Sequence, residues 1–282
     1  MSEQRARVDE TTYAILLAVA RACEALAIPW LVTGAAARFL LLERAYRLPP
    51  ALATEDVDFG VMVVSWEQYR QLRDELCQNG LFRPNRKQRQ RLDFEEGGYI
   101  DLIPFGGVES GGHSIEWPPG GDFVMRVLGF RDAYEDAVRV LVNDSLVVPV
   151  VSPEGLVLLK LFAWEDRHHA QPRKDARDIA YVLLHYETLL TVNALFGEHF
   201  AEVEASDYDL ALAAARVLGK RISAIASPYA LTELRDLLAR ELRMGVDSTL
   251  VREIGEYLAL TEAERAYQLL KCVHMGLSDR GA

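Results

Sequence analysis

The 282-residue chain has few cysteines and no long hydrophobic run, and each shortage excludes a class of protein. Its three cysteines, Cys23, Cys77 and Cys272, are far apart and odd in number, which argues against a disulfide framework or a cysteine-based zinc site and favours a reducing cytosol. The longest apolar run, residues 13–20, is far shorter than the ~20 residues that a transmembrane helix needs. The polar residues 1–10 lack the apolar core of a signal peptide. We therefore expect a cytoplasmic protein that does not bind membranes.

Positive charge is also scarce, because 31 Lys and Arg residues oppose 42 Asp and Glu residues and give a formal net charge of −11. This balance argues against passive coating of nucleic acid, although it leaves room for a local basic patch. Hydrophobic residues make up 50% of the chain and charged residues 26%, as in globular proteins. The length favours about two domains of roughly 150 residues. Only 5 of the 31 cations are lysines, so a lysine in an apolar segment stands out.

Hydrophobic periodicity divides the chain into an α/β part, residues 1–151, and a helical part, residues 152–282. In the first part, strands are predicted at 30–32, 57–64, 89–95, 99–105, 138–142 and 146–151, and helices at 9–27, 35–43, 66–78 and 130–135. In the second part, helices are predicted at 153–167 and 174–186, followed by an Ala-, Leu-, Glu- and Arg-rich stretch with helical periodicity. The pattern predicts a mixed α/β domain followed by a helical domain.

Carboxylates interrupt two of the predicted strands. Asp56 and Asp58 stand two residues apart where a strand begins, so the strand alternation sends both side chains to one face. Paired carboxylates repel unless a cation lies between them, and Mg²⁺ is held by a few carboxylates plus substrate phosphates. Asp101 interrupts a second apolar run, although buried acids are rare unless paired or bound to metal. A solvated strand end for the pair and an exposed edge strand for Asp101 are the alternatives.

Two further features suit phosphate binding. Gly34 and Ala35 follow a strand and open a helix, where free backbone N–H groups bind anions, although many strand–glycine–helix joints look similar. Lys160 is alone in an apolar helix, and its compact charge suits a phosphate as well as a snorkelling side chain. Asp175 and Asp178 share a helix face. They either neutralise Lys160 or Arg167, or favour the helix N-terminus electrostatically.

Residues 83–91 hold five cations and no acid. The cations are Arg83, Arg86, Lys87, Arg89 and Arg91. The stretch is either a solvated basic loop or a phosphate contact for NTP or RNA. If the following strand starts early, Lys87, Arg89 and Arg91 share one face beside the Asp101 strand.

The glycine turn, the paired acids, the third acid and the helical lysine follow one another in the order that metal-dependent nucleotidyl transfer needs. In that reaction divalent ions stabilise the attacking and leaving oxygens, and cationic groups stabilise the triphosphate. The chain resembles the polymerase-β-like nucleotidyltransferases, specifically the AbiEii/AbiGii toxin-type group. The resemblance covers roughly residues 10–190 and rests on residues 33–38, 55–58, 99–102, 159–167 and 174–179.

The resemblance implies a polymerase-β-like mixed sheet with flanking helices, followed by a helical region that contributes Lys160 and Asp175 to the active site. Asp56 and Asp58 would hold Mg²⁺ or Mn²⁺, and Asp101 would complete the metal site and assist deprotonation of the acceptor hydroxyl. The implied nucleotide-binding residues are Gly34, Ala35, Arg38 and Lys160, and the supporting residues are Asp175, Asp178 and Arg167. Ala35 replaces the usual Ser or Gly and offers phosphate only its backbone.

The implied function is transfer of a nucleoside monophosphate from an NTP, such as ATP, to an acceptor hydroxyl, with release of pyrophosphate. The family suggests a toxin of a bacterial toxin–antitoxin or phage-defence system, with RNA or tRNA as acceptor and a cognate antitoxin as partner. A small-molecule nucleotidyltransferase of the antibiotic-modifying type is the alternative enzyme. A non-catalytic nucleotide-binding module is the alternative outside enzymes.

Overall fold

The structure is a computed structural model that describes residues 4–51, 56–78, 80–118, 120–121, 123–258 and 263–279. Glu55, which belongs to the acidic motif, lies outside the described residues. The chain forms two compact units, Met1–Ser152 and Pro153–Ala282. The first unit is mixed α/β and the second is helical, which confirms the predicted fold class. Among the helices that the structure describes, none combines the length and the apolar character needed to cross a membrane.

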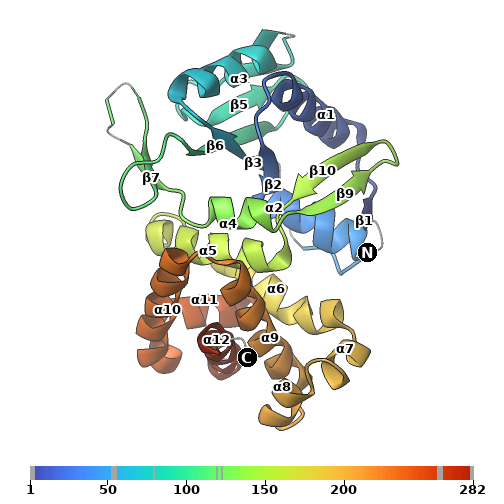
Figure 1. Cartoon of the computed structure of the whole chain (residues 1–282), viewed down its shortest axis with the longest axis vertical. Coiled ribbons are helices and arrows are strands. Elements are labelled where there is room, and N and C mark those ends of the chain that lie inside the picture. The colour runs from blue at the N-terminus through green and yellow to red at the C-terminus, as the bar shows by residue number, and fades with distance from the viewer. Residues whose placement is uncertain are drawn as a thin grey trace. The chain divides into compact units, whose positions relative to one another are not determined.

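An eight-stranded mixed sheet forms the centre of the first unit, in the order β1-β9-β10-β2-β3-β6-β5-β4 (Figure 1). In chain order its strands are β1 (Gln4–Ala6), β2 (Trp30–Thr33), β3 (Asp56–Val63), β4 (Phe82–Pro84), β5 (Arg91–Phe94), β6 (Tyr99–Gly106), β9 (Val138–Val142) and β10 (Leu146–Val150). The pairs β1–β9, β10–β2 and β3–β6 are parallel, and the other neighbours are antiparallel. Two short strands, β7 (Ser114–Glu116) and β8 (Val124–Arg126), pair separately.

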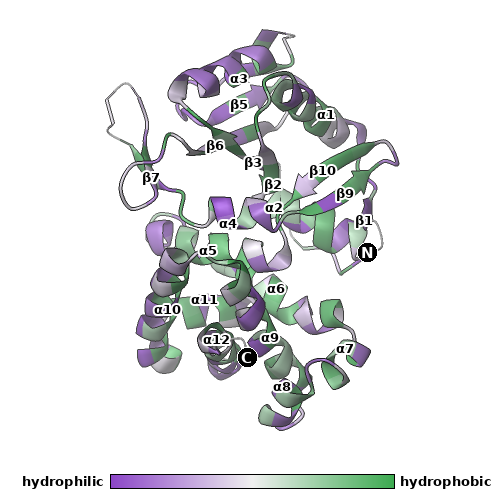
Figure 2. Ribbon diagram, viewed as in Figure 1, coloured by the Kyte–Doolittle hydropathy of each residue, from purple (hydrophilic) through white to green (hydrophobic). Residues whose placement is uncertain are grey.

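Helices flank this sheet and contribute to its core. They are α1 (Glu10–Ala25), α2 (Gly34–Ala37), the π-helix η1 (Arg38–Ala45), α3 (Trp66–Gln78) and α4 (Phe130–Glu135). Asp9 caps α1 by accepting a hydrogen bond from the backbone N–H of Thr12 at 2.8 Å. The strands β2, β6 and β10 are largely hydrophobic and α3 is largely hydrophilic (Figure 2). Leu16 of α1 and Phe59 of β3 are fully buried, so the sheet and α1 share the core.

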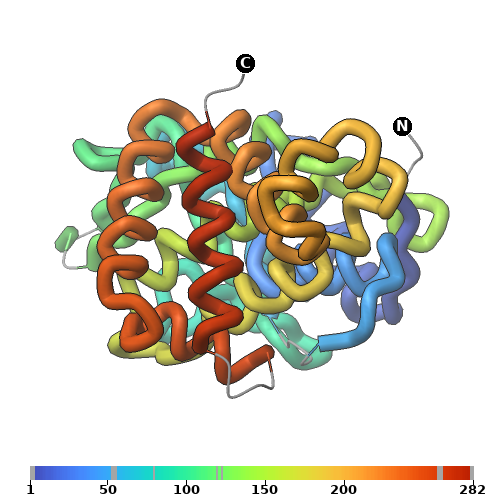
Figure 3. The backbone as a smooth tube through the Cα atoms, turned by 90° about the horizontal axis from the view of Figure 1, so that it is seen from below, coloured from blue at the N-terminus to red at the C-terminus, as the bar shows by residue number. Residues whose placement is uncertain are grey.

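The second unit consists of helices only in its described part. They are α5 (Pro153–Arg167), α6 (Lys174–Leu190), α7 (Val192–Phe196), α8 (Phe200–Ala205), α9 (Leu210–Ile225), α10 (Pro228–Arg243), η2 (Gly245–Asp247), α11 (Thr249–Tyr257) and α12 (Ala263–Ser278). Figure 3 shows α12, in red, as a straight helix beside α10.

Two glycines let α9 and α12 approach closely. A Cβ atom on Gly219 would lie 2.1 Å from the carbonyl oxygen of Val273, and one on Gly276 would lie 2.1 Å from that of Arg216. Each of these contacts is with backbone, which cannot yield as a flexible side chain can. The helical unit therefore depends on the absence of side chains at this crossing.

Candidate active site

The pairing of β3 with β6 brings the three predicted acids to one face of the sheet. Asp56 and Asp58 alternate along β3 and so point to the same side. Asp58 is the direct partner of Asp101 in the parallel register of β3 and β6. Because paired residues on neighbouring strands lie on the same face, about 4.8 Å apart in the hydrogen-bonding direction, the acids form one cluster. Alternation in two separate strands was visible in the sequence, whereas their register was not.

The glycine turn lies against this cluster. Thr33, the last residue of β2, pairs with Asp58 in the antiparallel register of β2 and β3. Gly34 follows with a φ of 65°, in the left-handed region that glycine tolerates best. A Cβ atom on Gly34 would lie 2.0 Å from Oδ2 of Asp58, so the carboxylate occupies the space that a side chain would need. The predicted phosphate turn and one predicted metal ligand are therefore in direct contact.

Arg91 binds Asp101 through both carboxylate oxygens. Its Nε donates to Oδ1 at 2.9 Å and its Nη2 donates to Oδ2 at 2.8 Å. The two residues are partners in the antiparallel register of β5 and β6. The side chains are only 18% and 12% exposed, so water screens the pair weakly. Asp101 is therefore buried as half of an ion pair, and the exposed-edge alternative is wrong.

Tyr99 and Asp56 extend the surroundings of this ion pair. The guanidinium carbon of Arg91 lies 3.4 Å from the centroid of the Tyr99 ring. The hydrogen bonds to Asp101 raise the pKa of Arg91, burial opposes this, and the charges of Asp101 and Asp56 add to the increase. Burial raises the pKa of Tyr99, and the charge of Asp56 raises it further, while Arg91 partly offsets the effect. Arg91 is thus a cation within the acid cluster.

The donor atoms of this cluster fit a divalent cation. Carboxylate oxygens beside free backbone N–H groups and a phosphate-sized turn are the surroundings in which proteins hold Mg²⁺ with substrate phosphates. Across the described ranges, no three His, Cys, Asp or Glu side chains already converge as a ligand set. Both oxygens of Asp101 face Arg91.

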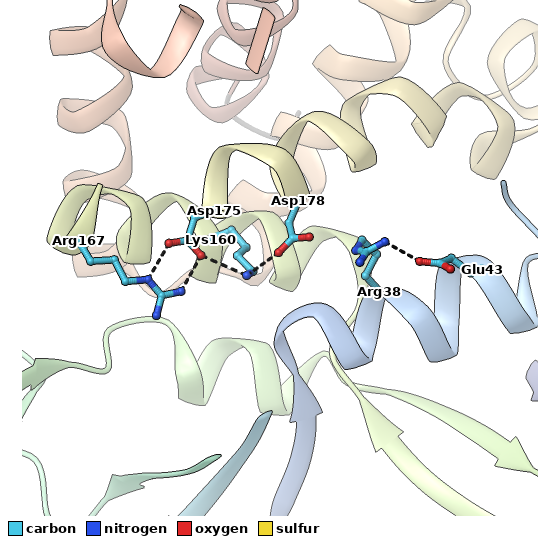
Figure 4. A network of polar contacts seen from close by, with 6 residues as sticks. All are labelled: Arg38, Glu43, Lys160, Arg167, Asp175 and Asp178. Carbon is cyan, nitrogen blue, oxygen red and sulfur yellow. Dashed lines mark hydrogen bonds and ion pairs between the residues drawn. The ribbon is translucent and has the colours of Figure 1, made fainter. Parts of the chain in front are cut away.

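Arg38 forms a buried ion pair in the first unit. Only 4% of its side chain is exposed, and its Nη1 donates to Oε1 of Glu43 at 2.5 Å (Figure 4). The i→i+5 bonding of a π-helix brings residues five apart onto one side, which explains why this pair forms in η1. Arg38, Glu43 and Asp56 help to line a cavity of about 640 Å³. Sequence reasoning proposed Arg38 for nucleotide binding and missed its partner Glu43.

Lys160 is the centre of a buried charge cluster in the second unit. Its Nζ lies 3.1 Å from Oδ1 of Asp175 and 2.5 Å from Oδ2 of Asp178 (Figure 4). Arg167 completes the cluster by donating from Nε and Nη2 to Asp175 at 2.7 and 2.6 Å. The Lys160 side chain is 7% exposed, so it does not snorkel to water. Of the two roles considered for the acids, neutralisation of Lys160 and Arg167 is the one these contacts support.

Electrostatics in this cluster follow from burial and pairing. Burial alone would lower the pKa of Lys160, but the charges of Asp178 and Asp175 outweigh it and hold the pKa above its usual value. Burial alone would raise the pKa of Asp175, but the hydrogen bonds from Arg167 and the charge of Lys160 lower it overall. All of these shifts favour the charged forms at neutral pH.

The basic stretch does not act as one surface. Strand β5 begins at Arg91, so the expected early start of the strand is wrong and Lys87 and Arg89 precede it. Arg89 donates from Nη1 to the carbonyl oxygens of Trp117 and Pro118 at 3.0 and 3.1 Å. Arg83 pairs with Glu95. Arg86 and Lys87 lie in the loop and are exposed.

A mixed sheet with a glycine turn against an acid-x-acid strand is the arrangement expected of a nucleotidyltransferase. The sequence model of the family described as "Nucleotidyl transferase AbiEii toxin, Type IV TA system" matches residues 16–266. The chain belongs to this AbiEii family and is a nucleotidyltransferase, which confirms the predicted family and enzyme class. Among curated protein sequences, none matches the chain significantly.

Solved structures of other nucleotidyltransferases are similar to the chain at low identity. The antibiotic-resistance factor ANT(2'')-Ia has 13% identity, covers 71% of this chain and 99% of its own, and has a TM-score of 0.39. A nucleotidyltransferase-like protein of Paracoccidioides brasiliensis has 19% identity, coverage of 71% and 90%, and a TM-score of 0.41. The CCA-adding enzyme of Thermotoga maritima, complexed with tRNA, has 14% identity, coverage of 99% and 85%, and a TM-score of 0.27. At such low TM-scores these likenesses do not bear on the chemistry of this chain.

Proposed function

We propose that the protein transfers a nucleoside monophosphate from an NTP to an acceptor hydroxyl with the help of Mg²⁺ or Mn²⁺. The observation that carries the proposal is the position of Asp58, which pairs in register with Asp101 and lies against the Gly34 turn. Metal-assisted phosphoryl chemistry needs acidic oxygens and a phosphate cradle at one place. The first unit supplies both within three neighbouring strands.

Each residue of the cluster has a defined task in this proposal. Asp56 and Asp58 would hold the divalent ions, which would supply positive charge to the transferred phosphoryl group. Gly34 and Ala35 offer backbone N–H groups to the phosphates, and Ala35 adds no hydroxyl. Asp101 completes the metal site and assists deprotonation of the acceptor hydroxyl. Arg38 binds the nucleotide in the cavity that it lines with Asp56.

We assign the Lys160 cluster a role in binding the triphosphate. Lys160, Arg167, Asp175 and Asp178 carry equal numbers of positive and negative charges in their paired state. An ammonium group held charged by buried carboxylates is ready to bind phosphate, and the carboxylates fix its position. Asp175 orients Lys160 in this role, because it contacts Lys160 and Arg167 together.

The biological role that we propose is that of a toxin in a toxin–antitoxin system, with RNA as the acceptor and a cognate antitoxin as partner. The description of the family supports the toxin role. The exposed cations Arg86 and Lys87 support an RNA acceptor, because exposed cations contact RNA phosphates. A small-molecule acceptor is the alternative outcome of the experiment below.

Labelled NTPs, tested one at a time, identify the reaction. Purified protein is incubated with each NTP, Mg²⁺ or Mn²⁺, and either total RNA or a small-metabolite fraction, and label transfer and pyrophosphate are measured. We expect metal-dependent labelling of RNA that the variant Asp58→Asn lacks. Asp93→Asn is the matched control, since Asp93 is an exposed acid of the same sheet, on strand β5, which is separated from β3 by β6. Undiminished transfer by Asp58→Asn refutes the metal assignment, and labelling of metabolites alone refutes the RNA acceptor.

A further inference from the structure

The acid cluster already contains a cation, and that cation belongs to the protein. Arg91 donates to both carboxylate oxygens of Asp101, with each oxygen receiving one hydrogen bond. The guanidinium is planar and forked, so this geometry is the strongest that an arginine and a carboxylate can adopt. The stacking of Arg91 on Tyr99 holds it in place from a second side. A divalent ion that binds Asp101 must therefore compete with Arg91 for the carboxylate oxygens.

We propose that Arg91 occupies the place of a cation beside Asp101 and must release this carboxylate before Asp101 can bind a divalent ion. Arg91 is thus a positioning residue that sets the metal affinity of the cluster. The inference rests on the proposed function, because it assumes that Asp58 and Asp101 bind the metal.

The contacts of Arg91 with Asp101 and Tyr99, together with the charge of Asp56, favour competition over simple orientation of Asp101. Asp101 is bound through both of its oxygens, whereas an orienting partner needs only one of them and leaves the other to the metal. The charge of Asp56 also acts on Arg91. The guanidinium therefore offsets negative charge that would otherwise attract a metal ion. Tyr99 adds only its ring face. Removal of Arg91 therefore removes both a competitor for Asp101 and a repulsive positive charge.

The chain offers a matched control on the same hairpin. Arg83 lies on β4, which pairs with β5, and it forms an exposed ion pair with Glu95. Arg83→Gln removes the same charge from the protein as Arg91→Gln does, but it leaves the pair of Arg91 with Asp101 intact. A general effect of net charge would change the Mn²⁺ affinity of both variants equally, whereas local competition would change only that of Arg91→Gln.

The experiment measures Mn²⁺ binding without turnover. Free Mn²⁺ is followed by electron paramagnetic resonance during titration of the full-length protein, freed of metal beforehand. We expect Arg91→Gln to bind Mn²⁺ about tenfold more tightly than wild type or more, the scale of a charged hydrogen bond. Arg83→Gln should stay within about twofold of wild type. An unchanged or weaker affinity of Arg91→Gln overturns the proposal, because an orienting role predicts weaker binding.

Two further measurements keep the test decisive. Arg91→Lys retains the charge and gives up the forked geometry, so it should bind Mn²⁺ with an affinity between those of wild type and Arg91→Gln. In wild type, the Nε–H signal of Arg91 in the NMR spectrum, assigned by its loss in Arg91→Lys, should lose its protection from solvent exchange when Mg²⁺ is added. A signal that stays protected at saturating Mg²⁺ overturns the proposal, even where Arg91→Gln fails to fold.

Asp58→Asn separates failure of this inference from failure of the proposed function. If Mn²⁺ binds wild type and Asp58→Asn equally, the metal site itself is wrong. If Asp58→Asn loses Mn²⁺ binding while Arg91→Gln binds no more tightly than wild type, the metal site stands and only the role of Arg91 is refuted.

Discussion

Replacement of Lys160 by methionine tests whether the buried charge cluster contributes to stability. Lys160→Met keeps the apolar stem and removes the ammonium group that lies 3.1 Å from Asp175 and 2.5 Å from Asp178. Asp175 retains its two hydrogen bonds from Arg167, whereas Asp178 loses the ammonium group that it contacts. A snorkelling lysine would make the same substitution nearly neutral.

The expected magnitude follows from burial. Removal of one partner from a buried ion pair costs about 3–5 kcal/mol of unfolding free energy, because a charge remains in a poorly solvated place. Arg167 still compensates Asp175, so we expect the lower end of this range, about 3 kcal/mol. The double variant Lys160→Met/Asp178→Asn removes the remaining charge and should recover at least about 1 kcal/mol. Arg173→Gln breaks an exposed pair with Glu256 and should cost less than about 1 kcal/mol.

The dependence of stability on pH gives a second signature. Asp175 has a lowered pKa in the folded state, so its contribution is present above its unfolded pKa of about 3.9 and is lost as the pH falls through the folded value. Lys160 has a raised pKa, so its contribution is present below about pH 10 and is lost as the pH rises through the folded value. The charge of Lys160 is one cause of the lowered pKa of Asp175, so Lys160→Met has less of this contribution to lose in acid. The deficit relative to wild type should therefore shrink as the pH falls below about 4.

Urea unfolding, followed by circular dichroism at several pH values, measures both effects. The midpoint and slope are fitted for wild type, the two Lys160 variants and Arg173→Gln. A deficit of Lys160→Met below about 1 kcal/mol at pH 7, or a deficit that does not shrink below about pH 4, would refute the reasoning.

Three shorter predictions concern glycine packing and the nucleotide. Gly219→Ala should lower the unfolding free energy by about 1–3 kcal/mol in denaturant titrations, because its Cβ would meet the carbonyl oxygen of Val273, while Gly111→Ala, which meets nothing within 4 Å, should change it by less than about 0.5 kcal/mol. Gly34→Ala should abolish nucleotidyl transfer in the labelled-NTP assay, because the new methyl group displaces the carboxylate of Asp58. In calorimetry, Lys160→Met should weaken NTP binding by about 1.5–3 kcal/mol, and equal affinity would remove Lys160 from the nucleotide site.

Elements with strong local signals were predicted closely. Helix α3 spans Trp66–Gln78 and helix α4 spans Phe130–Glu135, as their sequence patterns indicated. A glycine with positive φ follows shortly after the first, at Gly80, and another precedes the second, at Gly129. Helix ends marked by such glycines can be predicted from the sequence because they depend on local backbone conformation rather than on distant partners.

Elements that depend on a partner were missed. Strand β1 has three residues and pairs with β9, which lies more than a hundred residues later in the chain. Strands β7 and β8 are equally short and lie within or just after a glycine-rich segment. So short a strand has too few residues to display alternation. The π-helix η1 was expected as an ordinary helix, since a change from i→i+4 to i→i+5 bonding leaves no clear mark on hydrophobic periodicity.

The hairpin of β5 and β6 explains why the acids were visible in the sequence and their arginine partner was not. A turn of three residues, 96–98, would have set Asp93 opposite Asp101, with two like charges side by side. The observed register instead pairs Asp93 with Tyr99 and Arg91 with Asp101. Like charges directly opposite each other destabilise antiparallel strands, and opposite charges stabilise them. The charge pattern therefore favours the observed register, which is shifted by two residues from that of a three-residue turn. A shift of two residues keeps every side chain on its face and places Arg91 opposite Asp101, the carboxylate that the proposed reaction requires.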